Sequence, residues 1–245
     1  MIEKDLIAQF KVSENPSLED LRIEAFINLN PKNTTKEIEK WFIDKRKNKN
    51  MSVKTIPLNQ CKSWNFNENY IFHDSNDFFK VEGVRITQSK NREVSNGWDQ
   101  PILTQIGFDG GIVGLMRKII NGTPHYLVNA KEEPGNYKIV QMSPTIQATF
   151  ANLNQSHGGK KPQFSDIFLP YLKKKDDNLI FKSWFSEDGG RLLNKRNLGM
   201  IVNYSGNKFD TPNDDFIWMT LKQIKGFIKK NAWVNPHLRS LVSYI

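Results

Sequence analysis

The sequence predicts an α+β protein with a mixed or antiparallel sheet and helices at both ends. At the centre, residues 111–120 and 123–130 are apolar, β-prone runs separated by Asn121-Gly122, the pair favoured in a two-residue type I′ turn. Near each end, a capping box precedes apolar residues at helical spacing. With 38% hydrophobic and 11% aromatic residues among 245, the chain can bury a sizeable core.

The N-terminal capping box consists of Thr34 and Glu37. The residues that follow it at helical spacing are Ile38, Trp41, Phe42 and Lys45. We therefore expect a helix that ends near the basic run 45–49.

A polar connection, residues 48–52, follows this helix, and residues 71–79 and 81–86 then have strand-like composition. This change of composition predicts two regions. Residues 1–60 form an N-terminal helical cap, and residues 61–245 form one compact module.

Further strands are expected after the hairpin, each bounded by Gly, Asn, Asp or Pro, at residues 138–142, 179–185 and 198–202. Between them, residues 164–172 predict a short helix interrupted at Pro170.

The C-terminal capping box consists of Thr220 and Gln223. The apolar residues that share one helical face after it are Leu221, Ile224, Phe227 and Ile228. A shorter helix is expected after Pro236.

Composition excludes several classes of protein. The single cysteine, Cys61, cannot form an intramolecular disulfide, and the four histidines show no zinc-binding spacing, so we expect no structural metal. No apolar run approaches the roughly 18 residues that cross a bilayer, and the first ten residues carry charges where a signal peptide is apolar. We expect a cytoplasmic protein without membrane contact. The net charge of +9 suits nucleic acid, an anionic membrane or a phosphorylated substrate equally.

Residues 130–136 place Lys131, Glu132 and Glu133 at the end of a strand, before a Pro-Gly turn. Such side chains either line a cleft made of loops or form a solvated charged turn. His125, within a predicted strand, is interpreted as a structural histidine with its hydrogen bonds satisfied.

Residues 141–149 are rich in uncharged hydrogen-bonding side chains, which suit a sugar or a pyrimidine base, although an ordinary β-edge with a Ser-Pro turn fits as well. Residues 157–162 combine His157 with glycines and lysines, and residues 187–191 end on Arg191. Both segments fit either a phosphate site or a basic loop and hairpin turn.

Taken together, these segments resemble the NDP-hexose 2,3-dehydratase family in content and in order. The resemblance covers nearly the whole chain from the Trp41 helix onward. The segments are Trp98-Asp99-Gln100-Pro101-Ile102-Leu103, residues 111–116, residues 125–136 and 140–149, His157-Gly158-Gly159, residues 187–191, Trp218-Met219-Thr220-Leu221, Val234-Asn235 and Arg239-Ser240-Leu241.

The resemblance implies a Nudix-like core, no cofactor and a dTDP-linked 4-keto-6-deoxyhexose as substrate. It places the chain in deoxysugar biosynthesis, for lipopolysaccharide O-antigen or for glycosylated natural products. Family members from antibiotic pathways look like two tandem copies of such a module, whereas this chain is about one copy, so we expect a homodimer. Diphosphate hydrolysis, the Nudix activity, needs a helix of closely spaced glutamates that hold magnesium, and no such run is present.

The chemistry that the resemblance implies is a β-elimination. The 4-keto group acidifies the hydrogen on carbon 3, a general base removes it, and loss of the carbon 2 hydroxyl leads to a 3,4-diketo-2,6-dideoxy sugar. We expect Glu132 or Glu133 as acid/base, Lys131 polarising the keto oxygen and His157 as an alternative proton carrier. The expected substrate-binding residues are Arg191 and Arg239 for the diphosphate, Trp98 or Trp218 for stacking on the base, and Gln141, Ser143, Thr145, Gln147, Asn235 and Ser240 for polar contacts.

Two other functions fit parts of the pattern. A related isomerase or epimerase would use the same α-proton chemistry. A nucleic-acid-binding protein would explain the positive charge and the aromatic residues, but the basic residues are dispersed and no RRM, KH or helix-turn-helix signature is present, so we expect no nucleic-acid partner.

Overall fold

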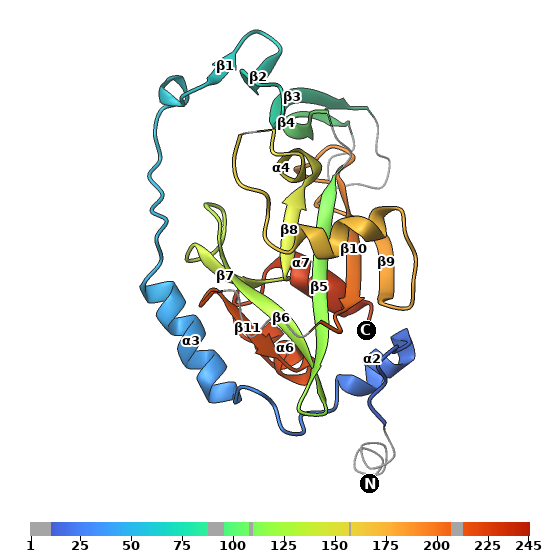
Figure 1. Cartoon of the computed structure of the whole chain (residues 1–245). Coiled ribbons are helices and arrows are strands. Elements are labelled where there is room, and N and C mark those ends of the chain that lie inside the picture. The colour runs from blue at the N-terminus through green and yellow to red at the C-terminus, as the bar shows by residue number, and fades with distance from the viewer. Residues whose placement is uncertain (1–10, 88–95, 108–109, 157, 207–212) are drawn as a thin grey trace.

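The predicted central hairpin consists of strands β5 (Gly111–Ile120) and β6 (Thr123–Glu132). A computed structural model describes residues 11–87, 96–107, 110–156, 158–206 and 213–245 (Figure 1). Asn121 and Gly122 have φ angles of 52° and 72°, as a type I′ turn requires, so the hairpin prediction is confirmed.

The hairpin opens into a fork away from its turn. β5 and β6 pair from the turn as far as Met116 and Leu127. Beyond that point β5 pairs with β8 (Ile146–Thr149), and β6 pairs with β7 (Val140–Ser143). The end of β6 therefore lies apart from the start of β5, with the two short strands between them.

The larger sheet is mixed. Its order is β11-β6-β5-β10-β9, where the outer strands are β9 (Leu179–Ser186), β10 (Arg196–Asn203) and β11 (Phe216–Met219). β10 runs parallel to β5, and the other pairings are antiparallel. The predicted α+β class with a mixed sheet is confirmed, and the Nudix-like character of the core stays a prediction.

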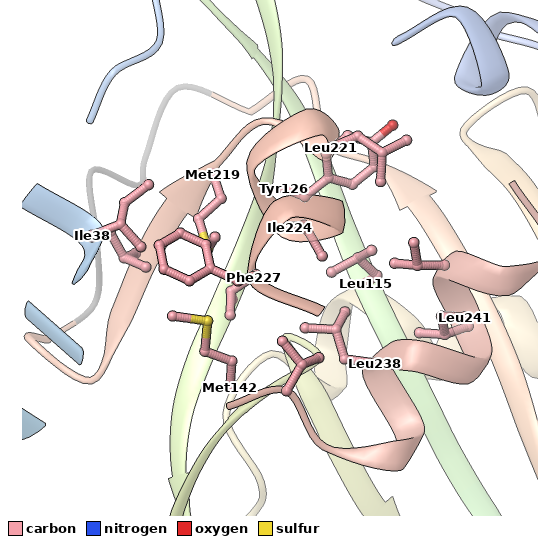
Figure 2. Packing of buried hydrophobic residues seen from close by; sticks show 14 of the residues in the cluster. Ile38, Leu115, Tyr126, Met142, Met219, Leu221, Ile224, Phe227, Leu238 and Leu241 are labelled. Carbon is pink, nitrogen blue, oxygen red and sulfur yellow. The ribbon is translucent and has the colours of Figure 1, made fainter. Parts of the chain in front are cut away.

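Both faces of this sheet are covered, and β5 takes part in two hydrophobic cores. Val113 and Leu115 lie in the first core, and Ile112 and Met116 lie in the second, because alternate side chains of a strand point to opposite faces. The first core is closed by α2 (Leu18–Glu24), α3 (Thr35–Lys47), α6 (Leu221–Ile228) and α7 (Pro236–Ser243), and Figure 2 shows side chains of α6 and α7 gathered over the strands. The second core is closed by α4 (Phe150–Leu153), α5 (Ser165–Phe168) and the 3₁₀ helix η2 (Leu169–Leu172).

The helices begin at side-chain caps. The predicted capping boxes at Thr34 and Thr220 are both confirmed, and they start α3 and α6. Ser17 and Asp20 form a third capping box at α2, a helix that we did not predict. The predicted break at Pro170 is confirmed, since α5 gives way there to η2. Among the described residues, no helix combines the length and apolar character needed to span a lipid bilayer.

A smaller antiparallel sheet lies at one end of the molecule (Figure 1). The chain reaches it from α3 through an extended segment and the 3₁₀ helix η1 (Leu58–Gln60). Its strands are β1 (Trp64–Phe66), β2 (Tyr70–His73), β3 (Phe79–Ile86) and β4 (Trp98–Gln105). Backbone hydrogen bonds join Leu103 of β4 to Arg191 and Leu193, so this sheet borders the loop between β9 and β10.

Two predicted strand boundaries were wrong. We expected a break near Lys80, but Lys80 pairs with Thr104 inside β3, and the chain turns earlier, where Asn76 has a φ of 54°. We expected a strand from Lys138, but β7 starts at Val140, because Lys138 and Ile139 have left-handed backbone conformations that a strand cannot contain. The predicted division at residue 60 stays a prediction.

Candidate active site

The fork in the central hairpin opens onto a cavity of about 220 Å³. Residues far apart in the sequence, from Phe79 to His237, line it, because β3, β5, β6, β8, β10 and the start of α7 meet there. The lining residues are Phe79, Ile112, Val113, Lys131, Glu133, Gln147, Ala148, Thr149, Asn152, Glu187, Lys195, Asn197 and His237. Polar and ionisable residues thus line the cavity together with apolar ones.

One wall of the cavity carries a cation beside a carboxylate. Lys131 Nζ lies 3.8 Å from Glu133 Oε1 and donates a hydrogen bond of 2.9 Å to the carbonyl oxygen of Gln147. Burial lowers the pKa of the Lys131 ammonium, although the charge of Glu133 opposes this effect. The pair can supply a positive charge and a proton acceptor to a ligand.

Glu132 lies on the opposite face of the strand from this pair. Its carboxylate accepts hydrogen bonds from the backbone N–H groups of Asn50 and Met51, at 2.9 and 2.6 Å. It therefore fixes the segment that follows α3. Of the two glutamates predicted as acid/base, the structure brings only Glu133 into the cavity, together with Lys131.

Gln147 ties the wall of the cavity to α7. Its Nε2 donates to Glu133 Oε1 at 3.0 Å, and its Oε1 accepts from Asn235 Nδ2 at 2.9 Å and from Ser143 Oγ at 3.2 Å. Asn235 also caps α7, since its Oδ1 accepts from the backbone N–H of Leu238 at 2.9 Å. Ser143, Gln147 and Asn235, predicted as polar contacts to substrate, are therefore brought together beside Glu133.

The same cavity holds an ionisable pair that we did not predict. His237 Nε2 lies 2.8 Å from Glu187 Oε1, and Asn197 Nδ2 donates a hydrogen bond to the same oxygen. The hydrogen bond from His237 lowers the pKa of the Glu187 carboxyl, against the effect of its burial. Glu187 belongs to a segment that we singled out, but Arg191 was its proposed functional residue. His237 lies between two family segments, Val234-Asn235 and Arg239-Ser240-Leu241, but it was not itself singled out.

Other predicted polar residues have structural roles. Gln141 is buried, and its Nε2 donates to the carbonyl oxygen of Ala232 at 3.0 Å. Thr145 Oγ1 accepts from the N–H of Met116 and donates to the carbonyl oxygen of Leu127, and so joins the two branches at the fork. His125 is fully buried, with Nε2 accepting from the N–H of Lys32 and Nδ1 beside the carbonyl oxygen of Thr123, so its structural interpretation is confirmed.

The predicted base-stacking and diphosphate residues do not line the cavity. Trp218 is fully buried in the second core, where a base cannot reach its ring. Trp98 is partly buried in β4, and its Nε1 donates to Gln100 Oε1 at 2.7 Å. Arg191 is exposed and forms an ion pair with Asp188. On α7, Arg239 is exposed and Ser240 is partly buried, and His157 lies outside the described residues.

Two wider openings adjoin the cavity. One, of about 590 Å³, is lined by residues 186–187, 189 and 192–196, and the other, of about 330 Å³, by residues of β4 and by residues 193–195. Lys195 lines the cavity and both openings. Arg196 lines the larger opening and stacks on Trp184, with its guanidinium carbon 4.3 Å from the ring centroid. Cations and an aromatic ring thus lie beside the small cavity.

A family model described as NDP-hexose 2,3-dehydratase matches residues 35–245. The chain belongs to the NDP-hexose 2,3-dehydratase family. The match includes every described residue that lines the cavity. The family resemblance seen in the sequence is therefore confirmed.

Three similar curated proteins are named dTDP-4-dehydro-6-deoxy-alpha-D-glucopyranose 2,3-dehydratase. The protein of Saccharopolyspora spinosa is 33% identical over 214 residues, which cover 86% of this chain and 42% of the relative. Those of Amycolatopsis orientalis and Streptomyces violaceoruber are 31% and 30% identical, over 85% and 83% of this chain and 44% of each relative. The chain therefore spans less than half the length of the curated relatives that it matches.

Proposed function

We propose that this member of the family removes water across carbons 2 and 3 of a dTDP-4-keto-6-deoxyhexose, in the cytoplasm, as a step of deoxysugar biosynthesis. The observation that carries the proposal is the Lys131–Glu133 pair in a cavity built from the part of the chain that the family model matches. An ammonium beside a carboxylate supplies the two groups that enolate formation needs.

The cavity suits the hexose part of such a substrate. A volume of about 220 Å³ is below the roughly 300–1,000 Å³ of pockets that enclose drug-sized ligands, so the nucleotide has to extend into the adjoining openings. Lys195 and Arg196 lie there, and Arg191 belongs to the loop that lines the larger opening. We assign the diphosphate to these cations and the base to the exposed ring of Trp184.

The Lys131–Glu133 pair performs the first step. Glu133 takes the proton from carbon 3, and the Lys131 ammonium stabilises the negative charge that develops on the 4-keto oxygen. A positive charge in a partly buried site acts through a lower effective dielectric than in water, so its effect on the enolate is larger. Gln147 holds the carboxylate in place through its amide.

Incubation with dTDP-4-keto-6-deoxyglucose tests this function. Mass analysis should show the loss of one water from the sugar nucleotide, followed by free dTDP as the product decomposes. Unchanged substrate at saturating concentration would contradict the proposal. A product of unchanged mass with an altered NMR spectrum would instead show an isomerase or epimerase.

We also propose that the working enzyme is a homodimer. Four large apolar side chains between α3 and β2 are more than 45% exposed, namely Val53, Ile56, Leu58 and Phe66. A second copy would cover them and would add a second module, in keeping with relatives more than twice as long as the matched region. Sedimentation analysis at the enzyme concentration used for turnover should give twice the chain mass of 28.4 kDa. A monomeric mass with full activity would contradict the dimer.

A further inference from the structure

The proposed first step leaves a second ionisable pair in the cavity without a role. His237 and Glu187 line the same cavity as Lys131 and Glu133, and their side chains keep 19% and 18% of their exposure. This exposed fraction is enough for contact with a small ligand. Both walls of the cavity thus carry groups that can exchange protons.

The position of His237 is fixed from two directions. It is the second residue of α7, and the N-cap of that helix, Asn235, is hydrogen-bonded to Gln147, which in turn holds Glu133. Glu187, the partner of His237, is held by β10, because Asn197 of that strand donates a hydrogen bond to its carboxylate. The distance between the two walls is therefore set by a continuous series of hydrogen bonds and by the sheet, which favours a preorganised site.

The hydrogen bond between Glu187 and His237 also fixes the imidazole. Because a carboxylate oxygen accepts, Nε2 carries the hydrogen in this contact, and Nδ1 is the nitrogen that remains for a ligand. A carboxylate that orients an imidazole in this way stabilises the imidazolium form during proton transfer. Imidazole is also the side chain that ordinarily gains and loses a proton near neutral pH.

We propose that His237, oriented by Glu187, is the general acid that protonates the carbon 2 hydroxyl of the substrate as it leaves. The proposal rests on the proposed function, because it assigns the second half of the same elimination. Hydroxide is a poor leaving group, so loss of the hydroxyl needs a proton donor distinct from the base that opens the reaction. Glu187 acts through the imidazole as a positioning residue.

The proton transfers balance between the two walls. Glu133 takes the proton from carbon 3, and the electron pair of the carbon 3–hydrogen bond forms the enolate. When the enolate collapses, this pair becomes the carbon 2–carbon 3 double bond. The carbon 2–oxygen bond breaks with its pair on oxygen, and a proton from the His237 imidazolium completes the water. In the tautomerisation, Glu133 returns its proton to carbon 2 and His237 takes the proton of the carbon 3 enol, which restores both groups.

Exchange of the carbon 3 hydrogen in D₂O distinguishes the role of the Lys131–Glu133 pair from that of His237. In His237→Gln, the base and Lys131 are intact, so carbon 3 should still exchange with solvent at a rate within about fivefold of wild type. Elimination, followed as dTDP release, should fall by about 10²–10⁴-fold, the usual contribution of a positioned acid or base. His73→Gln, on the smaller sheet, is the matched control and should retain both activities.

Glu187→Gln tests the positioning role. It should lower kcat with a change in KM of less than about threefold, because the proposed role of the carboxylate is exerted through its hydrogen bond to the imidazole. The pH dependence of kcat/KM should change in Glu187→Gln, because the substitution alters the hydrogen bond that orients the proposed acid, and it should change in His237→Gln, because the acid itself is removed. The charged groups that line the same cavity as this imidazole are Glu187, Lys195, Lys131 and Glu133.

The outcomes distinguish this inference from the proposed function. Wild-type elimination in His237→Gln would overturn the role of His237, and so would joint loss of exchange and elimination in a variant that unfolds at the wild-type temperature and binds dTDP normally. If the wild-type protein itself neither exchanges nor eliminates, the proposed function fails and His237 has no elimination to assist. An unchanged pH profile in Glu187→Gln would overturn the positioning role.

Discussion

Replacing Glu133 with glutamine should lower kcat for dehydration by about 10²–10⁴-fold. The change keeps the size of the side chain and its contact with Gln147 but removes the proton acceptor beside Lys131. Affinity for dTDP, measured by calorimetry, should stay within about twofold of wild type, because the nucleotide extends away from this wall. Steady-state kinetics of dTDP release provides the measurement.

Glu132→Gln is the matched control for this prediction. It changes the neighbouring glutamate in the same way, but on the opposite face of β6, where the carboxylate holds the backbone of Asn50 and Met51. We expect a small loss of stability and near-normal turnover. Normal turnover in Glu133→Gln, or equal losses in both variants, would contradict the assignment of Glu133 as the base.

Replacing Glu24 with glutamine should destabilise the protein by about 3–5 kcal/mol, the usual cost of breaking a buried ion pair. Glu24 and Arg117 are almost completely buried, and Arg117 Nη2 lies 2.6 Å from Glu24 Oε1. Tyr126 donates a further hydrogen bond of 2.6 Å to the same carboxylate, and burial raises the pKa of this phenol well above its ordinary value, which keeps the donor protonated. Urea unfolding followed by fluorescence measures the loss.

The reason for so large a loss is the charge that remains. Arg117 also donates to Asn203 and to the carbonyl oxygen of Ser13, but neither neutral partner replaces the carboxylate. The double variant Glu24→Leu/Arg117→Met removes both charges and should therefore be more stable than Glu24→Gln alone. A loss below about 1 kcal/mol in Glu24→Gln would show that the pair contributes little to holding α2 on the sheet.

Local signals in the sequence were sufficient for the hairpin and the capped helices. Asn121-Gly122 determines its turn through backbone conformations that these two residues tolerate, and Thr34 and Thr220 start helices through contacts three residues away. The Ser17–Asp20 capping box is the same kind of local signal, so α2, which we did not predict, was also predictable from the sequence. Where the backbone conformation depends on the tertiary structure, as at Lys138 and Ile139, the strand prediction was wrong.

Only the part of the candidate site that contains Lys131 and Glu133 was predictable from the sequence. Lys131 and Glu133 are two residues apart, and the alternation of a strand would have placed them on one face and Glu132 on the other. The second wall joins Glu187 to His237, which are 50 residues apart, through the pairing of β9 with β10 and the packing of α7. No spacing in the sequence reports that proximity. Trp218, expected to stack on a base, is instead buried by core packing, which a sequence motif does not reveal.

The most direct test of the proposed dehydration is to trap its product. A 3,4-diketo sugar contains two adjacent ketones, which condense with o-phenylenediamine to a stable quinoxaline, whereas the sugar of the 4-keto substrate and of its epimers has a single ketone and does not form this ring in the absence of an oxidant. Incubation of the protein with dTDP-4-keto-6-deoxyglucose and the diamine should yield the quinoxaline of a dideoxy sugar, and Glu133→Gln should yield little of it. Absence of the quinoxaline, while authentic diketone is trapped under the same conditions, would contradict the 2,3-dehydratase function.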